Sequence, residues 1–194
     1  MLTWAMVFYS FIQARNTEEG ALLGESCQLK IGVLSDTHGL LRPEVLEKLQ
    51  GADMILHAGD VCSAEIPAKL REIAPLFIVR GNNDSASGGL PARELIETPG
   101  GGIYLLHNLR ELDIDPRACG VKVVVSGHTH RFACEERGGV LYANPGACGH
   151  RRFSLPLTMA WLEYQYGKWS FLPVELKPYR AVPLFQFVFG LERF

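Results

Sequence analysis

The stretch LKIGVLSDTHGLLRPEVLEKLQGADMILHAGD, residues 29–60, decides the fold class of this chain. It contains two uninterrupted apolar runs, LKIGVL (29–34) and DMILH (53–57), of the kind that strands buried on both faces show. Between them, PEVLEKLQ begins with Pro43, which suits the first position of a helix. The order strand, helix, strand predicts two parallel strands joined by a right-handed crossover.

Further segments extend this pattern along the chain. The segment AEIPAKLREIA (64–74) has apolar residues at helical spacing, and LFIVR (76–80) follows it as a third buried strand. The runs GIYLLH (102–107) and VKVVVS (121–126) predict two more strands of the same kind. The first half therefore has the β-α-β-α-β order of a parallel sheet.

Beyond residue 130 the pattern changes to one of hairpins. RFACEERGGVLYANPG (131–146) predicts two short strands that turn at Gly138 and Gly139. LTMAWLEYQYGKWSFLPVEL (157–176) predicts a longer hairpin that turns near Gly167. We expect the second half to be antiparallel, in a mixed sheet or in a second sheet packed on the first.

Composition places the chain among ordinary globular proteins. Its 194 residues suffice for one sizeable domain, with 47% apolar and 21% charged residues and a net charge of −2. No basic stripe favours binding of a nucleic-acid polymer. The five cysteines are scattered and form no CxxC pair, which argues against a disulfide framework and fits a reducing, cytoplasmic location.

Both ends of the chain are expected to lie outside the domain. We divide the sequence into an N-terminal extension (1–28), a domain (29–176) and a C-terminal tail (177–194). The extension opens with about a dozen apolar residues, fewer than the roughly 20 that a transmembrane helix needs, and it lacks the features of a signal peptide. We therefore predict no transmembrane segment, an N-terminal extension that is peripheral or poorly ordered, and an apolar tail that packs on the domain or on another subunit.

A metal-binding type of side chain follows each of the five predicted strands. Ligands of open α/β sheets bind outside the carboxyl ends of the strands, so these residues should converge on one edge. They are Asp36 and His38; His57 and Asp60; Asn82, Asn83 and Asp84; His107; and His128 and His130.

The chemistry of this set indicates two metal ions. Carboxylates, an amide oxygen and imidazoles suit Mn²⁺, Zn²⁺ or Fe²⁺, and the absence of thiolates argues against a closed structural zinc site. Seven ligands are too many for one tetrahedral ion but suit two ions that share a carboxylate. The seven are Asp36, His38, Asp60, Asn82, His107, His128 and His130.

The blocks DTHG, GD, GNND, H and GHTH, in this order, resemble those of the calcineurin-like metallophosphoesterases. The chain is most similar to the small single-domain phosphodiesterases of the YfcE type, from about Lys30 to about Trp169, with the NPGA turn (144–147) included. The resemblance implies a four-layer αββα sandwich of two mixed β-sheets. It also implies two divalent ions, with Mn²⁺ expected and Zn²⁺, Fe²⁺ or Ni²⁺ as alternatives, and it leaves a homo-oligomer open.

The resemblance also implies roles for the ligands. Asp36, His38 and His130 would hold the first ion, and Asn82, His107 and His128 the second. Asp60 would bridge the two, and Asp60, Asn82 and His128 would form the catalytic set.

The sequence departs from the wider family after the metal-binding asparagine. Many relatives carry a histidine there that assists the leaving group, whereas Asn83 cannot act as a general acid at neutral pH. YfcE-type enzymes commonly lack this histidine as well. We therefore expect activity toward esters with good leaving groups, or a leaving-group proton supplied by a metal-bound water.

Five further residues are candidates for supporting the ligands or binding substrate. We expect His57 to be a buried, hydrogen-bonded support, and Asp84 either to orient a ligand histidine or to cap its loop. Asn144 and Gly146 belong to the NPGA turn, whose backbone N–H groups could hold phosphate oxygens. His150 could bind phosphate with a neighbouring arginine, or be an inert surface residue.

The sequence therefore predicts a dinuclear metal-dependent phosphoesterase, most simply a phosphodiesterase acting on a small phosphate ester. The alternative is a protein-binding scaffold of the same fold, as in the retromer subunit Vps29, with little or no catalysis. A phosphomonoesterase differs only in how its pocket treats a second ester group, which the sequence does not resolve.

Overall fold

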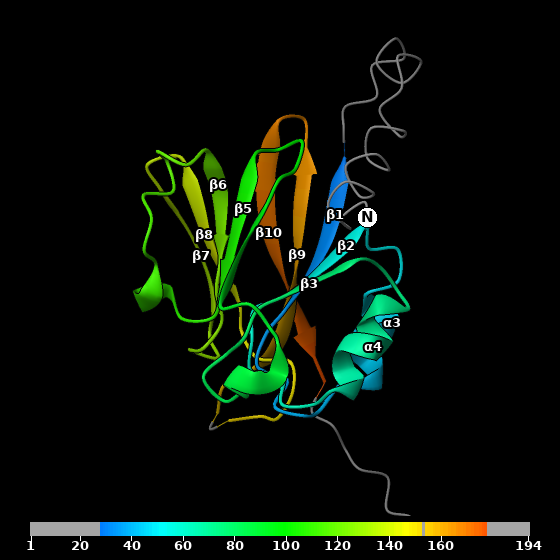
Figure 1. The fold of residues 1–194 in the computed structure, drawn as a ribbon. Coiled ribbons are helices and arrows are strands. Elements are labelled where there is room, and N and C mark those ends of the chain that lie inside the picture. The colour runs from blue at the N-terminus through cyan, green and yellow to red at the C-terminus, as the bar shows by residue number, and fades with distance from the viewer. Residues whose placement is uncertain (1–27, 153, 178–194) are drawn as a thin grey trace, which may run out of the picture.

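The computed structural model describes residues 28–152 and 154–177. Two five-stranded sheets face each other (Figure 1), in the strand orders β10-β9-β1-β2-β3 (sheet A) and β4-β5-β6-β8-β7 (sheet B). The predicted fold class, a sandwich of two mixed sheets, is confirmed. The predictions for the N-terminal extension fall on residues 1–27, and most of those for the tail on 178–194, which lie outside the described residues.

Sheet A contains the predicted parallel strands. β1 (Leu29–Leu34), β2 (Met54–His57) and β3 (Leu76–Ile78) pair in parallel. The hairpin of β9 (Leu157–Gln165) and β10 (Lys168–Leu176) adds to the other side of β1, to which β9 runs antiparallel. Sheet A is therefore mixed, and its central strand β1 is apolar on both faces.

Two helices cover the outer face of sheet A (Figure 1). They are α3 (Pro43–Lys48), with Pro43 in its first turn as predicted, and α4 (Glu65–Arg71). Both are amphipathic, and α4 buries Ile66 and Leu70 in an apolar cluster with residues of sheet A. These helices act as the crossovers that make β1, β2 and β3 parallel.

Sheet B corrects the expectation of an antiparallel second half. It comprises β4 (Arg93–Ile96), β5 (Gly102–Leu106), β6 (Val121–Val125), β7 (Phe132–Arg137) and β8 (Val140–Pro145). The β7–β8 hairpin forms as predicted, but β8 rather than β7 lies beside β6, and it pairs with β6 in parallel. β7 therefore becomes the edge strand, and only the β4–β5 and β7–β8 pairs are antiparallel.

The main apolar core lies between the two sheets, and a smaller cluster lies on the outer face of sheet B. Leu109, Leu112 and Ile114 cover that smaller cluster. In the part of the chain that the structure describes, this outer layer consists of the 3₁₀ turn η2 (Leu109–Glu111) and irregular chain rather than an α-helix. None of the described helices is long and apolar enough to cross a membrane.

Loops from both sheets meet at one end of the sandwich, where β1, β2, β3, β5 and β6 have their carboxyl ends (Figure 1). Backbone hydrogen bonds fix these loops to one another. Within sheet A, Asp36 N donates to Gly59 O at 3.0 Å, and between the sheets Cys148 N donates to Ser35 O at 3.2 Å. The residues that follow the five strands are thereby brought to one place.

Candidate metal centre

Three of the predicted ligands form a compact and largely buried group, here called the aspartate group: Asp36, His38 and His130. Asp36 Oδ1 lies 3.1 Å from His130 Nε2 and 3.7 Å from His38 Nε2. The two Nε2 atoms lie 3.3 Å apart. The three side chains come from the loops after β1 and β6, in different sheets, and they direct ligand atoms at a common point.

Three others form a second group, here called the asparagine group: Asn82, His107 and His128. Asn82 Oδ1 lies 3.0 Å from His107 Nε2 and 2.9 Å from His128 Nδ1. His107 is buried, whereas His128 is exposed. This group therefore opens toward solvent on the side of His128.

Asp60 lies between the two groups. Its Oδ2 atom is 3.6 Å from His38 Nε2 and 3.5 Å from His107 Nε2, so one carboxylate oxygen faces a histidine of each group. Asn83 holds the same carboxylate at both oxygens, because its backbone N–H donates to Oδ1 at 2.8 Å and its side-chain amide to Oδ2 at 2.6 Å. The side chain of Asn83 is thus directed at Asp60.

The hydrogen bonds of His107 indicate that a cation belongs in the asparagine group. His107 Nδ1 lies 2.7 Å from the carbonyl oxygen of Ala58, which can only accept, so the proton is on Nδ1. With its proton on Nδ1, His107 can direct the lone pair of Nε2 toward the Asn82 amide, whose oxygen lies 3.0 Å away. A ring nitrogen and an amide oxygen placed this close together are a donor set that fits a metal ion.

The aspartate group shows the same need through an unsatisfied carboxylate. Asp36 is fully buried; its Oδ2 accepts from Ser35 Oγ at 2.7 Å and from His128 N at 3.1 Å, but its Oδ1 has no hydrogen-bond donor among the described residues. Burial favours the neutral acid, but interactions with His130 and Ser35 outweigh it and lower the pKa of Asp36. The oxygen Oδ1, which has no donor in the described part of the chain and faces two histidine nitrogens, therefore fits a bound cation.

The ligand loops share an unusual backbone conformation. Six non-glycine residues at this end, two in each of three loops, have φ between 46° and 68°, in the left-handed region. Aspartate and histidine adopt this region more readily than most residues do. The six are Asp36, His38, Asp60, Cys62, His128 and His130.

Glycines let these loops approach one another. A Cβ atom at Gly81 would overlap the backbone and carboxylate of Asp60, and one at Gly127 would overlap the side chain of Ser35. The geometry of the centre thus depends on the absence of a side chain at two contacts between loops. Neither position was singled out from the sequence.

Asn144 supports the loop that carries His128 and His130. Its Nδ2 donates to Gly127 O at 2.6 Å and contacts Thr129 Oγ1 at 3.2 Å, while its Oδ1 accepts from Gly146 N at 2.9 Å. The Gly146 N–H is therefore engaged within the turn. Gly146 is buried and its N–H donates to Asn144, so in this structure that N–H does not point to a phosphate site.

His57 lies beneath the aspartate group. It is fully buried, and its Nδ1 accepts from Gly59 N while its Nε2 contacts Thr37 Oγ1 at 3.0 Å. Burial lowers the pKa of His57 to about 4, so the ring is neutral. The structure therefore places His57 behind Thr37, away from the ligand atoms of both groups.

The remaining two candidates lie outside the ligand groups. Asp84 accepts from the backbone N–H groups of Val61, Cys62 and Gly81, so its geometry is that of a loop cap rather than a partner of a ligand histidine. His150 is exposed and makes no hydrogen bond or ion pair within residues 28–152 and 154–177.

Sequence reasoning missed Ser35, Thr37 and the clamp of Asn83 on Asp60. Ser35 and Thr37 flank Asp36, and three polar residues directly after an apolar strand are a signal that could have drawn attention to them. The contact between Asn83 and Asp60 joins loops 23 residues apart, and the local sequence carries no sign of it.

Comparison with known proteins gives the family of the chain. Residues 29–167 match the calcineurin-like phosphoesterase superfamily domain. A probable metallophosphoesterase of Methanothermobacter thermautotrophicus is 34% identical over 66% of this chain and 83% of its own length. Phosphodiesterase MJ0936 of Methanocaldococcus jannaschii is 26% identical over 62% of this chain and 84% of its own length.

Solved structures share the fold. YfcE, a phosphoesterase from E. coli, aligns with a TM-score of 0.57 at 25% identity, over 69% of this chain and 88% of its own. Vps29 from Chaetomium thermophilum aligns with a TM-score of 0.62 at 21% identity, over 76% of this chain and 97% of its own. The architecture thus occurs both in a phosphoesterase and in Vps29.

Proposed function

This chain belongs to the calcineurin-like phosphoesterase superfamily, and we propose that it is a phosphodiesterase that works with two divalent cations. One observation carries the proposal: ligand atoms from five separate loops converge in two groups that share the carboxylate of Asp60. Burying so many imidazoles and carboxylates is unfavourable unless ions satisfy them. The substrate we propose is a small phosphate ester.

We assign one ion to each ligand group. Asp36, His38 and His130 would hold the first ion, and Asn82, His107 and His128 the second. Asp60 would contact both, and its negative charge would offset their mutual repulsion. When bound, such a pair of cations lowers the pKa of water and neutralises the charge that develops on the phosphate.

The protein's own residues orient these ligands. The Ala58 carbonyl fixes the proton of His107 on Nδ1 and leaves Nε2 free to bind an ion. Ser35 and the His128 N–H hold Asp36 Oδ2, so that Oδ1 faces His38 and His130. Asn83 fixes the orientation of the Asp60 carboxylate in the same way.

Asn83 also bears on the leaving group. Its amide is not a proton donor of useful acidity, and it is directed at Asp60. An enzyme without a general acid at this position forgoes a factor of about 10²–10⁴ for poor leaving groups. We therefore propose that the rate falls steeply as the pKa of the leaving alcohol rises, and a flat dependence would count against this role of Asn83.

Further details of the proposal follow from chemistry. The mixed set of nitrogen and oxygen ligands suits Mn²⁺, with Zn²⁺ or Fe²⁺ as alternatives. The four described cysteines are free, which fits a cytoplasmic location.

The test is metal removal followed by separate addition of Mn²⁺, Zn²⁺ and Mg²⁺, with hydrolysis of bis(4-nitrophenyl) phosphate and 4-nitrophenyl phosphate as readout. We expect activity to return with Mn²⁺ and to favour the diester. His128→Ala should lose most of it, whereas His150→Ala, the exposed control, should retain it. A protein that binds divalent ions but hydrolyses neither ester would favour the scaffolding alternative.

A further inference from the structure

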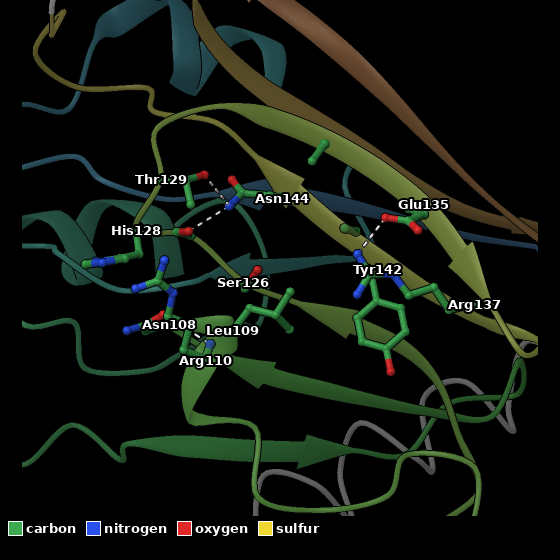
Figure 2. Close-up of a pocket in the computed structure, with 13 residues that line it drawn as sticks. Asn108, Leu109, Arg110, Ser126, His128, Thr129, Glu135, Arg137, Tyr142 and Asn144 are labelled. Atoms are coloured by element: carbon green, nitrogen blue, oxygen red, sulfur yellow. Dashed lines mark hydrogen bonds and ion pairs between the residues drawn. The ribbon is translucent and has the colours of Figure 1, made fainter.

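A pocket of about 520 Å³ adjoins the asparagine group on the outer face of sheet B. Strands β7 and β8 form one wall, the start of η2 forms the other, and His128 lies at one end (Figure 2). We propose that this pocket receives the second ester group of a phosphodiester, and that the group it selects carries a flat aromatic or heteroaromatic ring. The inference rests on the proposed function and names the substrate class of that site.

The size of the pocket suits an ester group. Pockets of about 300–1,000 Å³ hold organic groups as large as a small drug molecule. A phosphodiester has two organic groups, one that leaves and one that stays on phosphorus, and the pocket beside His128 gives the second of them a place.

The wall formed by β7 and β8 has no net charge. Tyr142 presents its ring there, and the guanidinium carbon of Arg137 lies 5.1 Å from the centre of that ring. Arg137 also pairs with Glu135 at 2.6 Å, so the two charges compensate each other. Leu109 adds an apolar surface from the other wall. An aromatic ring and a guanidinium plane favour a flat ring over a flexible polar group.

Arg110 gives the end of the pocket near His128 a positive charge. Its backbone N–H donates to Asn108 Oδ1 at 3.1 Å, which fixes the turn. Its guanidinium makes no ion pair within the part of the chain that the structure describes, and Figure 2 shows the side chain extending toward His128. An uncompensated guanidinium attracts a phosphate anion, so Arg110 would meet the phosphate while the ring enters beyond it.

A second pocket, of about 740 Å³, lies beside α4 and provides a comparison. It is lined by residues such as Cys62, Arg71, Asn83 and Leu90, but by no aromatic side chain and by none of the seven proposed ligands. The pocket at His128 contains both features. The observations therefore favour the pocket at His128 as the place of the second ester group.

The test uses two diesters with the same leaving group, bis(4-nitrophenyl) phosphate and methyl 4-nitrophenyl phosphate. Their ratio of kcat/KM isolates the second ester group. Ala133→Phe should fill the pocket from an exposed position on β7, and Tyr142→Ala should remove its ring. We expect either change to lower the ratio about 5- to 10-fold, the range in which ring stacking contributes.

Two controls sharpen the result. Arg71→Ala, in the pocket beside α4, should leave the ratio unchanged. Arg110→Gln should raise KM for both diesters alike, because it acts on the phosphate, and should also leave the ratio unchanged. Thermal unfolding checks that Tyr142→Ala is folded, and Ala133→Phe, on an exposed edge strand, tests the same pocket without removing a packed side chain.

The outcomes separate this inference from the proposed function. The pocket assignment is overturned if the ratio of kcat/KM for the two diesters is unchanged in Ala133→Phe and Tyr142→Ala, or if it falls in Arg71→Ala. Neither result would contradict the hydrolysis itself. If no metal form hydrolyses either diester, calorimetric binding of bis(4-nitrophenyl) phosphate to the metal-stripped protein decides. Binding that Ala133→Phe abolishes keeps the pocket and overturns the hydrolase, and an absence of binding overturns both.

Discussion

The two ligand groups lie side by side and share Asp60, yet they differ in charge and in exposure. The aspartate group has a buried carboxylate whose Oδ1 lacks a donor, and both of its histidines are largely buried. The asparagine group has a neutral amide in place of that carboxylate, and its His128 is exposed. The first group therefore has the stronger electrostatic demand for a cation, and the second is the one that faces incoming molecules.

This difference indicates a division of roles. An ion at the aspartate group would bind more tightly and would mainly hold the centre together, because that group is the more acidic and the less accessible. An ion at the asparagine group would exchange more readily and would stand nearest the pocket that contains Arg110 and Tyr142. If the two groups are unequal, loss of Asp36 and loss of His128 should affect ion binding to different extents.

The largest effect is expected from Asp60→Asn, which removes the charge shared by both groups. Hydrolysis should fall roughly 10³-fold, and the metal content should fall at both positions, because the repulsion between the ions is no longer offset. Elemental analysis with parallel rate measurements checks this. Asp113→Asn, a matched change at an exposed carboxylate paired with Arg93, should alter neither quantity. Unchanged metal content in Asp60→Asn would remove Asp60 from the shared position.

The next largest effect is expected on the stability of the protein at low pH, through His57, which lies beneath the aspartate group. The pKa of His57 is lowered to about 4 in the folded protein against 6.5 in the unfolded chain, so the unfolded chain binds more protons between these values. The stability of the metal-free protein should therefore fall by about 3 kcal/mol as pH drops from 6.5 to 4. Urea unfolding across this pH range measures it, with His57→Gln as the comparison. If the two proteins lose stability equally, His57 is not responsible.

A somewhat smaller effect is expected from Asp36→Asn, which neutralises the unsatisfied carboxylate. Ions present at 100 times their Kd stabilise a protein by about 2.7 kcal/mol, or roughly 5–10 °C in Tm for a chain of this size. Asp36→Asn should abolish most of this rise and should also lower the Tm of the metal-free protein, because the lowered pKa of Asp36 means that its ionised form contributes to stability. Differential scanning calorimetry with and without Mn²⁺ checks both. His128→Ala should reduce the rise less, and the reverse order would contradict the ranking of the groups.

The smallest effect is expected from Asn144→Ala. The loop that Asn144 holds carries one histidine of each group, His128 and His130, so its loss should weaken both positions alike. Loss of a residue that orients metal ligands costs about 10- to 100-fold in affinity, and we expect the lower figure because the loop keeps its other hydrogen bonds. Competition with a metal-sensitive dye resolves the two affinities. A loss confined to one position would show that the loop does not couple them.

Much of the fold could be predicted because it depends on local sequence patterns. The apolar runs 29–34 and 53–57, with Pro43 between them, are enough to predict two parallel strands and a crossover helix. The edge strand β4 is not predicted because RELI has neither an uninterrupted apolar run nor a strict alternation of apolar and polar residues. The parallel pairing of β8 with β6 was missed because a hairpin pattern does not say which of its two strands joins the sheet.

The sequence was sufficient to predict which residues come together in the candidate centre, because each of them follows the end of a strand. It was not sufficient to predict the hydrogen-bond partners that hold those residues in place. Asn83 on Asp60, Asp84 on backbone N–H groups, and Asn144 on the 127–130 loop are contacts between segments far apart in the chain. The pocket at His128 could not be predicted for the same reason, because it forms only where η2 and the β7–β8 hairpin lie beside each other.

The left-handed backbone at the ligand positions has a consequence for how such a protein can change over generations. Glycine, asparagine and aspartate tolerate that conformation best among the residues, so exchanges among them at Asp36 or Asp60 preserve the path of the chain. A related protein could thus lose its catalytic activity through one or two substitutions without a change in backbone conformation. The identity of the side chains at these positions, rather than the shape of the backbone, distinguishes an active hydrolase from an inactive protein of the same fold.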